Sequence, residues 1–233
     1  MALEYFKMAR KKQTRGACLY CGREMTRGGL SKHLYTCPKR LETIISANDH
    51  PGSDKRQYHF VVRDAWEGDF WLHIEMSESS TLEDLDSYLR TIWLECCGHL
   101  SRFSVGRWGD EIPMHTSLRR LSKSTVELYH IYDFGTSSET VVQLIDQRHG
   151  KPTTPHPVTL MARNAMPEIR CMECTHQATR LCLECVYDYD TSGTLCDSHV
   201  SHHPHEEYGE PLALVNSPRS GMCGYDGPAE PPY

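Results

Sequence analysis

Eight cysteines and several histidines stand at the spacing of zinc ligands, in two groups far apart in the sequence. The N-terminal group comprises Cys18, Cys21, His33 and Cys37. The C-terminal group comprises Cys171, Cys174, Cys182, Cys185, Cys196, His199, His202, His203 and His205. Zinc takes thiolate and imidazole ligands in a tetrahedron, and a two-residue gap lets both sulfurs of one turn reach the same ion. The spacing therefore predicts metal-bound thiols rather than disulfides, which indicates a reducing, cytoplasmic compartment.

The charge around the two groups has opposite sign. The whole chain of 233 residues has a net charge of −6. Residues 1–40 hold ten Lys and Arg against two Glu, a net charge of +8, whereas residues 166–233 hold three Arg against eleven acids, a net charge of −8. A basic segment gains affinity for phosphates by releasing counterions, and an acidic segment is repelled by them. We therefore expect the two zinc-bound segments to have different partners.

The N-terminal group is similar to a ββα zinc finger of the Cys-Cys-His-Cys type, over residues 14–40. Leu30, His33 and Leu34 follow at helical spacing, so His33 and Cys37 should lie one turn apart and point at the first two cysteines. In fingers that read DNA, residues at the start of the helix reach base edges. The candidate nucleic-acid-binding residues are Arg27, Lys32, Lys39 and Arg40. The alternative is a finger that only docks on the rest of the chain or on a protein partner.

The middle of the chain, residues 56–150, carries the conventional core. Alternating apolar residues at 58–62 and 70–76 predict a β-hairpin. Ser80-Thr-Leu-Glu83 is a capping-box pattern, and apolar residues at helical period then run from Leu82 to Cys96, with Gly98 as a stop. Further strands are expected around residues 103–105, 126–132 and 141–145. The predicted fold is α+β, a small central sheet with one packed helix, flanked by two zinc-stapled modules.

Two further patterns in the middle region also occur in enzymes, but we predict no catalytic residue there. Cys96, Cys97 and His99 could form a thiol–imidazole pair, yet Cys96 falls on the apolar face of the helix, where cysteine commonly fills a core. Asp133-Phe-Gly135 is also the metal-binding tripeptide of kinases, but neither a Gly-rich phosphate loop nor a His-Arg-Asp loop accompanies it. We expect the tripeptide to end a strand and begin a turn.

The segment from Thr81 to Phe103, together with Tyr132-Asp-Phe-Gly135, resembles the plasmid Ri open-reading-frame-three-like family, also called transposon-passenger TnpR-like protein. The similarity covers about residues 56–150, and Asn216 to Tyr225 resembles the end of zinc-bearing members. It implies a small α+β domain without an established activity. The serine nucleophile setting of a resolvase is not recognisable, so recombinase activity is not inferred.

A proline-rich linker, residues 151–165, is expected to separate the middle domain from the C-terminal module, residues 166–233. That module resembles the cross-braced B-box and RING zinc modules, in which the first and third ligand pairs share one ion and the second and fourth pairs share the other. The resemblance implies two ligand sets. They are Cys171, Cys174, Cys196 and His199 for the first ion, and Cys182, Cys185, His203 and His205 for the second. His202 is an alternative to either of the last two, and Cys223 is an alternative to His205.

Four protein ligands per ion leave no position for a reacting water, so the three expected zinc ions are predicted to be structural. The lead hypothesis is a non-enzymatic zinc-binding adaptor or regulator that binds protein, with the basic finger contacting nucleic acid or an acidic partner. One alternative is a sequence-specific DNA-binding regulator. The other is an enzyme of unknown reaction that uses a cleft in the middle domain. No membrane span is expected, and the oligomeric state stays open.

Overall fold

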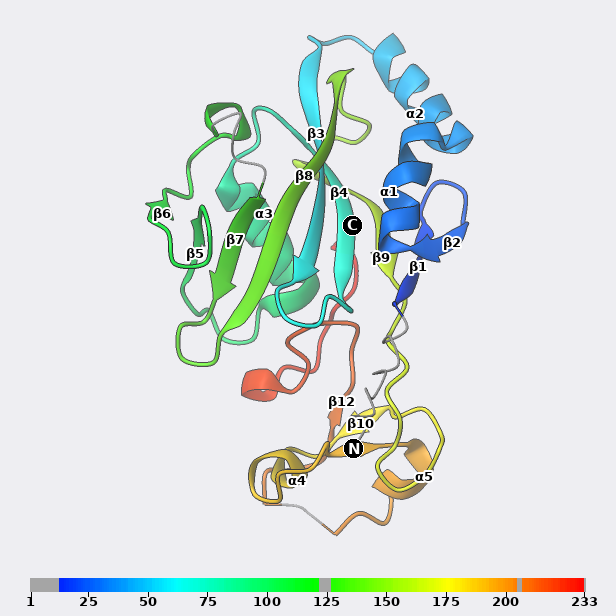
Figure 1. Ribbon diagram of the computed structural model, residues 1–233, viewed down its shortest axis with the longest axis vertical. Coiled ribbons are helices and arrows are strands. Elements are labelled where there is room, and N and C mark those ends of the chain that lie inside the picture. Colours follow the sequence, from blue (N-terminus) through cyan, green and yellow to red (C-terminus); the bar gives the residue numbers. More distant parts are fainter. Residues whose placement is uncertain (1–12, 122–126, 205–206, 233) are drawn as a thin grey trace, which may run out of the picture.

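The computed structural model describes residues 13–121, 127–204 and 207–232, and its largest element is one antiparallel sheet of nine strands (Figure 1). In spatial order the strands are β2 (Glu24–Thr26), β1 (Arg15–Cys18), β9 (Val158–Asn164), β4 (Trp71–Ser77), β3 (Lys55–Asp64), β8 (Ser138–Gly150), β7 (Glu127–Tyr132), β5 (Ser101–Ser104) and β6 (Glu111–Ile112). The predicted α+β mixture is present, but the prediction of a small sheet was wrong. The sheet is large because it incorporates the N-terminal finger.

Strand β9 joins the finger to the middle domain. Its residues pair with β1 on one side and with β4 on the other. Residues 151–165 were expected to be a linker, and that prediction was wrong for their second half, because 158–164 lie inside the sheet. Sequence reasoning missed the strand because it follows a proline-rich stretch and is buried on both faces, so it has no alternating pattern.

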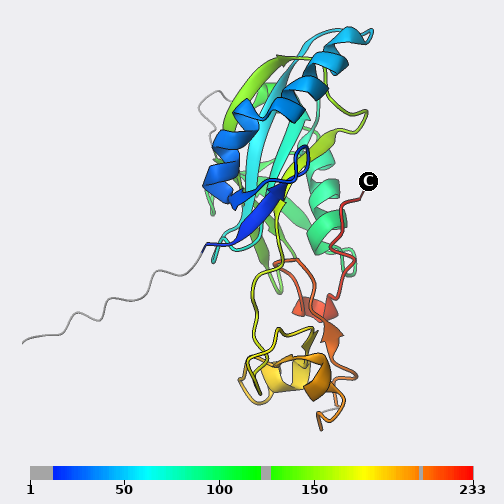
Figure 2. The ribbon, with the colours of Figure 1, turned by 90° about the vertical axis from the view of Figure 1, so that its right-hand side faces the viewer.

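Helices cover both faces of the sheet (Figure 2). Helix α3 (Leu82–Leu89) continues into a π-helical turn, Arg90–Leu94, and packs on the main core with Phe60, Leu72 and Ile74. Helices α1 (Arg27–Thr36) and α2 (Pro38–Asp49) lie over the opposite face. The sequence predicted α3 but extended it to Cys96, and it placed the capping box one residue early, since Thr81 and Asp84 form it.

Aspartates at chain reversals fix two hairpins. Asp64 ends β3, and its carboxylate accepts hydrogen bonds from four backbone amides of the following turn, those of Trp66, Glu67, Gly68 and Phe70. Asp133 ends β7 with φ 63°, and it accepts from the amides of Gly135 and Thr136. The Asp-Phe-Gly tripeptide is thus the strand end and turn that the sequence predicts.

The C-terminal module lies beneath the large sheet in Figure 1. Its small sheet has the order β11-β10-β12. Its elements are β10 (Arg180–Leu181), α4 (Leu183–Tyr187), β11 (Thr194–Leu195), α5 (Asp197–Val200) and β12 (Leu212–Ala213). After β12 the chain returns to the large sheet. The predicted module 166–233 therefore includes a returning segment that belongs with the middle domain.

Two polar side chains of the returning segment, residues 214–232, are buried against the middle domain. Ser217 Oγ donates to the carbonyl of Trp93 at 2.6 Å. The guanidinium of Arg219 is wholly buried and pairs with Asp133 at 2.7 Å. Burial raises the pKa of Asp133, but Arg219 and the turn amides outweigh burial and lower that pKa to about 2. The carboxylate is therefore charged at neutral pH and needs its partner. None of the helices in the described residues is long and apolar enough to cross a membrane.

Replacing Arg219 with Met should therefore destabilise the protein by about 3–5 kcal/mol, because it leaves the Asp133 carboxylate buried without its cation. Urea unfolding followed by tryptophan fluorescence measures the loss. Lys39→Ala is the matched control, since the Lys39–Glu42 pair is exposed and its removal should leave the unfolding midpoint unchanged. A loss below about 1 kcal/mol in Arg219→Met would contradict the role of the pair.

Candidate metal centres

The described residues contain four groups of Cys and His whose ligand atoms lie within 4.8 Å of one another, compatible with zinc. A tetrahedral zinc ion sets its ligand atoms about 3.8 Å apart for two sulfurs and about 3.6 Å apart for sulfur and nitrogen, from bonds of about 2.3 and 2.0 Å. Those distances provide a geometric test for each group.

The finger group brings Cys18, Cys21, His33 and Cys37 together. Cys18 closes β1, and Cys21 lies in the β1–β2 turn, where Gly22 takes the positive φ of 72° that the chain reversal requires. His33 lies on α1 and Cys37 directly after it. The Sγ atoms of Cys18 and Cys37 are 3.9 Å apart, and Cys21 Sγ is 3.2 Å from His33 Nε2. The group thus has the size of a tetrahedral site.

The finger is docked on the large sheet through its own core. Leu30 and Leu34 on α1 are fully buried against Trp71 and Met161 of the sheet. Below them, His59 and His73 share a hydrogen bond of 2.9 Å, and His73 Nε2 bonds the carbonyl of Arg27. Burial lowers the pKa of His73 to about 4. Burial, together with the neighbouring His73, lowers the pKa of His59 to about 2. Both imidazoles are therefore neutral and serve the interface between finger and sheet.

The four candidate nucleic-acid-binding residues differ in how far their charged groups are exposed to solvent. Arg40 is buried, donates to the carbonyl of Leu34 and pairs with Glu75 at 2.7 Å, so it faces the interior and not a ligand. Arg27 is half-buried and donates to the carbonyl of Gly68. Lys32 is exposed, and Lys39 is exposed in its pair with Glu42. Only Lys32 and Lys39 present their charge to solvent.

The first group of the C-terminal module contains Cys171, Cys174, Cys196 and His199. Cys174 and Cys196 have their sulfurs 3.8 Å apart, and His199 Nδ1 lies 3.5 Å from Cys171 and 3.3 Å from Cys196. Burial alone would raise the pKa of Cys171. Hydrogen bonds from backbone amides and from His199 outweigh it and lower that pKa to about 6. A thiolate at neutral pH is the form that binds a metal.

The second group of the module contains Cys182, Cys185 and His203. Cys185 Sγ is 3.3 Å from His203 Nε2, and Cys182 Sγ accepts from the amide of Cys185. The pairs thus alternate between the two groups, in the cross-braced order that the B-box and RING resemblance implies. His205 lies outside the described residues. His202 is bonded to Ser201 and belongs to none of the four groups.

The fourth group, Cys96, Cys97, His99 and Cys223, was not predicted as a metal site. The suggestion that Cys223 replaces His205 was wrong, because Cys223 lies beside Cys97 and not beside Cys185. Cys96 lies just past the end of the π-helical turn and not on the helix; it is half-buried and packs against the main core, as we expected. A usable signal was present in the two Cys-Gly steps at Cys97-Gly98 and Cys223-Gly224, which have the form of half-knuckles.

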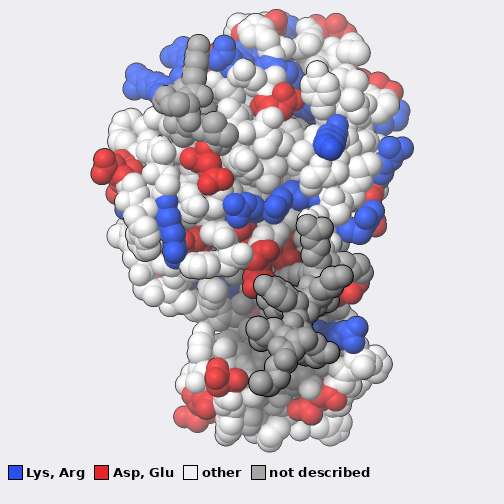
Figure 3. Space-filling model, in the orientation of Figure 1, with Lys and Arg blue, Asp and Glu red and all other residues white. Residues whose placement is uncertain are grey.

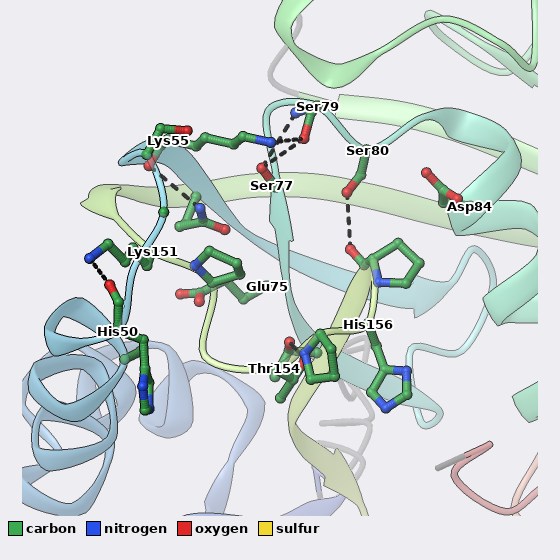
Figure 4. Close-up of a pocket in the computed structure, with 18 of the residues that line it drawn as sticks. His50, Lys55, Glu75, Ser77, Ser79, Ser80, Asp84, Lys151, Thr154 and His156 are labelled. Carbon is green, nitrogen blue, oxygen red and sulfur yellow. Dashed lines mark hydrogen bonds between the residues drawn. The ribbon is translucent and has the colours of Figure 1, made fainter.

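A polar hollow of about 600 Å³ lies between the end of α2, the start of β3 and the loop 151–157 (Figure 4). Its charged groups have protein partners. Lys55 Nζ donates to Ser79, and Lys151 Nζ donates to the carbonyl of His50. Glu75 is held by Arg40 and Arg148. Because each of these charged groups is already bonded within the protein, we assign no reaction to the hollow.

No family model matches the chain, and no curated protein matches it. Among solved structures, a protein of unknown function from Methanosarcina mazei Go1 is similar at 20% identity, over 49% of this chain and 73% of that one, with a TM-score of 0.39. A likeness at this level carries no argument about fold or function. The resemblance to the plasmid Ri family therefore stays a prediction.

Breaking the finger group should loosen the large sheet, whereas breaking a group of the C-terminal module should not. In Cys37→Ser the ligand set that holds α1 over Trp71 is broken, so β1 should detach from β9. We expect faster amide hydrogen exchange in 158–164 and a melting temperature lower by roughly 5–10 °C. Cys174→Ser is the matched control and should leave exchange in 158–164 unchanged. Equal exchange in both variants would show that the finger docks without its metal.

Proposed function

We propose that this protein is a non-enzymatic zinc-binding adaptor or regulator whose middle domain binds a protein partner. The observation that carries the proposal is an exposed stack of Trp66, Arg107 and Trp108. The two indole side chains are 67% and 77% exposed. Contiguous exposed apolar surface marks interaction sites, and Trp and Arg are among the residues most enriched at the energetic centres of protein interfaces.

The stack is held rigid before any partner arrives. The guanidinium carbon of Arg107 lies 4.5 Å from the ring centroid of Trp66 and 4.9 Å from that of Trp108. Its Nε and Nη2 atoms donate to both carboxylate oxygens of Glu139, at 2.7 and 2.8 Å. A preorganised side chain loses little conformational entropy on binding. The fixed stack is therefore suited to insert into a complementary pocket of another protein.

Zinc has a scaffolding role in this proposal. The finger and the cross-braced module hold three of the four Cys/His groups, for which we propose three structural ions. Acidic side chains are spread over the visible face of the C-terminal module, whereas Lys and Arg gather mainly over the upper part of the molecule (Figure 3). The acidic surface favours a protein over a nucleic acid as the partner of that module.

Nucleic-acid contact by the finger has less support than protein binding. Of the four candidate residues only Lys32 and Lys39 present their charge to solvent. Two phosphate contacts give a shallow salt dependence, with a slope of roughly −2 in log affinity against log salt. A measured slope far steeper than this, with full-length protein and duplex DNA, would favour the DNA-binding regulator over the adaptor.

The test replaces Trp108 with Ala in the full-length protein. A partner recovered by cross-linking from the native host should bind this variant about 30-fold more weakly, a loss of about 2 kcal/mol, because the anchor of the interface is removed. Calorimetry with the purified partner measures the affinity. Arg107→Lys should also weaken binding, since an ammonium cannot stack between two rings or pair with both oxygens of Glu139.

Ile45→Ala is the control for that experiment. Ile45 is 64% exposed on α2, away from the stack, so its removal takes away exposed apolar surface without touching the proposed interface. Unchanged affinity in Ile45→Ala together with the loss in Trp108→Ala supports the proposal. Equal affinity in all variants contradicts the placement of the interface at the stack.

A further inference from the structure

The fourth Cys/His group connects two segments that are 126 residues apart in sequence. Cys96, Cys97 and His99 lie between the π-helical turn and β5, whereas Cys223 lies in the returning C-terminal segment. We propose that these four residues bind a further zinc ion, which fastens the C-terminal segment to the middle domain. The site is independent of the proposed protein-binding function, since it shares no residue with the Trp–Arg–Trp stack.

The four ligand atoms of this group lie within 4.8 Å of one another, which is compatible with one metal ion. Cys97 Sγ lies 3.5 Å from Cys96 Sγ and 3.6 Å from Cys223 Sγ. His99 Nε2 lies 2.9 Å from Cys97 Sγ and 3.6 Å from Cys223 Sγ. A zinc ion requires separations of about 3.8 Å between sulfurs and about 3.6 Å between sulfur and nitrogen. The finger group, at 3.9 and 3.2 Å, departs from these values in the same way, with one sulfur–nitrogen distance that is short.

The backbone on both sides turns so that the ligands converge. Gly98 has φ 75°, close to the 72° of Gly22 in the finger, and in each case the glycine directly follows a cysteine ligand. Cys223 itself has φ 52°, an uncommon conformation for a residue with a side chain. Gly221 and Gly224 on either side of it also have positive φ. These turns direct the thiol of Cys223 towards Cys97.

A hydrogen-bond network holds the 96–99 loop in place. The carboxylate of Glu95 accepts from the amide of Gly98 and from the hydroxyl of Tyr132. That hydroxyl in turn accepts from the amides of Cys96 and His99, at 3.5 and 3.4 Å. Groups that bond the backbone between ligands fix the ligand geometry, as the outer shell of a metal site does. The loop is therefore built before the ion binds.

The chemistry of the four groups selects a soft divalent ion. Three thiols and one imidazole form a Cys₃His set, which zinc binds with all four positions filled by protein. A disulfide between Cys97 and Cys223 needs a bond of about 2.05 Å, and their sulfurs lie 3.6 Å apart. A reactive thiol–imidazole pair would need only one cysteine and His99. That alternative does not explain why Cys223 also lies beside them.

This site is more open than the finger site. Cys97 and Cys223 are exposed and Cys96 and His99 are half-buried, whereas Cys18 and Cys37 are buried beneath α1. A chelator reaches an ion with exposed ligands first. We therefore expect the ion at Cys96, Cys97, His99 and Cys223 to be removed before the finger ion, which makes the attachment of the C-terminal segment dependent on available zinc.

Native mass spectrometry of the full chain, prepared with zinc and reductant, tests the site. Cys223→Ser should carry one zinc ion fewer than the wild type, and Cys97→Ser should show the same loss. Met222→Leu is the matched control, since it changes the neighbouring residue and keeps every ligand. Limited EDTA should remove one ion from the wild type and make Cys223 reactive to iodoacetamide, as peptide mapping shows, and added zinc should restore protection.

Equal zinc content in the wild type, Cys223→Ser and Cys97→Ser would overturn the proposal. So would a Cys97–Cys223 disulfide in the reduced, zinc-loaded protein, or alkylation of Cys223 that zinc does not suppress. If Cys223→Ser fails to fold, the alkylation measurement on the wild-type chain decides the question by itself. Since none of these readouts involves a protein partner, failure of the proposed adaptor function would not affect them.

Discussion

The pairing of β9 with both β1 and β4 is the interaction on which the architecture depends. Without it, the finger would be a separate module joined by a flexible chain. With it, the finger is the edge of a nine-stranded sheet and α1 covers part of the sheet's second face. The Cys/His group of the finger therefore packs directly on the sheet, through Trp71 and Met161 above all.

The two regions that hold the predicted zinc ligands differ in how much apolar core supports them. The finger forms its core together with the sheet, because Leu30 and Leu34 pack against residues that belong to β4 and β9. The C-terminal module has only a small apolar core. Its buried cluster is Cys182, Cys185 and Leu195, with Val200 packed alongside, so most of what holds it is ligand atoms. We expect a segment with so small a core to depend on a bound metal for its fold.

Buried charge pairs complete the packing where apolar contact ends. Glu75 is almost fully buried between Arg40 and Arg148, which ties α2 to β4 and β8. Asp133 and Arg219 do the same for the returning segment. Burying each ion pair costs the hydration free energy of its charges. The attraction between the two partners offsets that cost only while both are present. The arginines in these pairs are bound inside the protein, although from the sequence alone they could equally contact an external partner.

The sequence by itself determined the local parts of this protein. The Cys-x2-Cys pairs, the pairing of His33 with Cys37, the β3–β4 hairpin, α3 and the Asp133 turn follow from residues a few positions apart, because spacing within one turn or one hairpin fixes which side chains can meet. The tertiary structure alone decided the rest. Cys223 meets Cys97 across 126 residues, Arg40 is turned inward to Glu75, and 158–164 is a central strand. Such contacts depend on how the chain closes on itself. A local pattern such as Cys-Gly can mark a possible ligand, but it does not say which distant residue that ligand will meet.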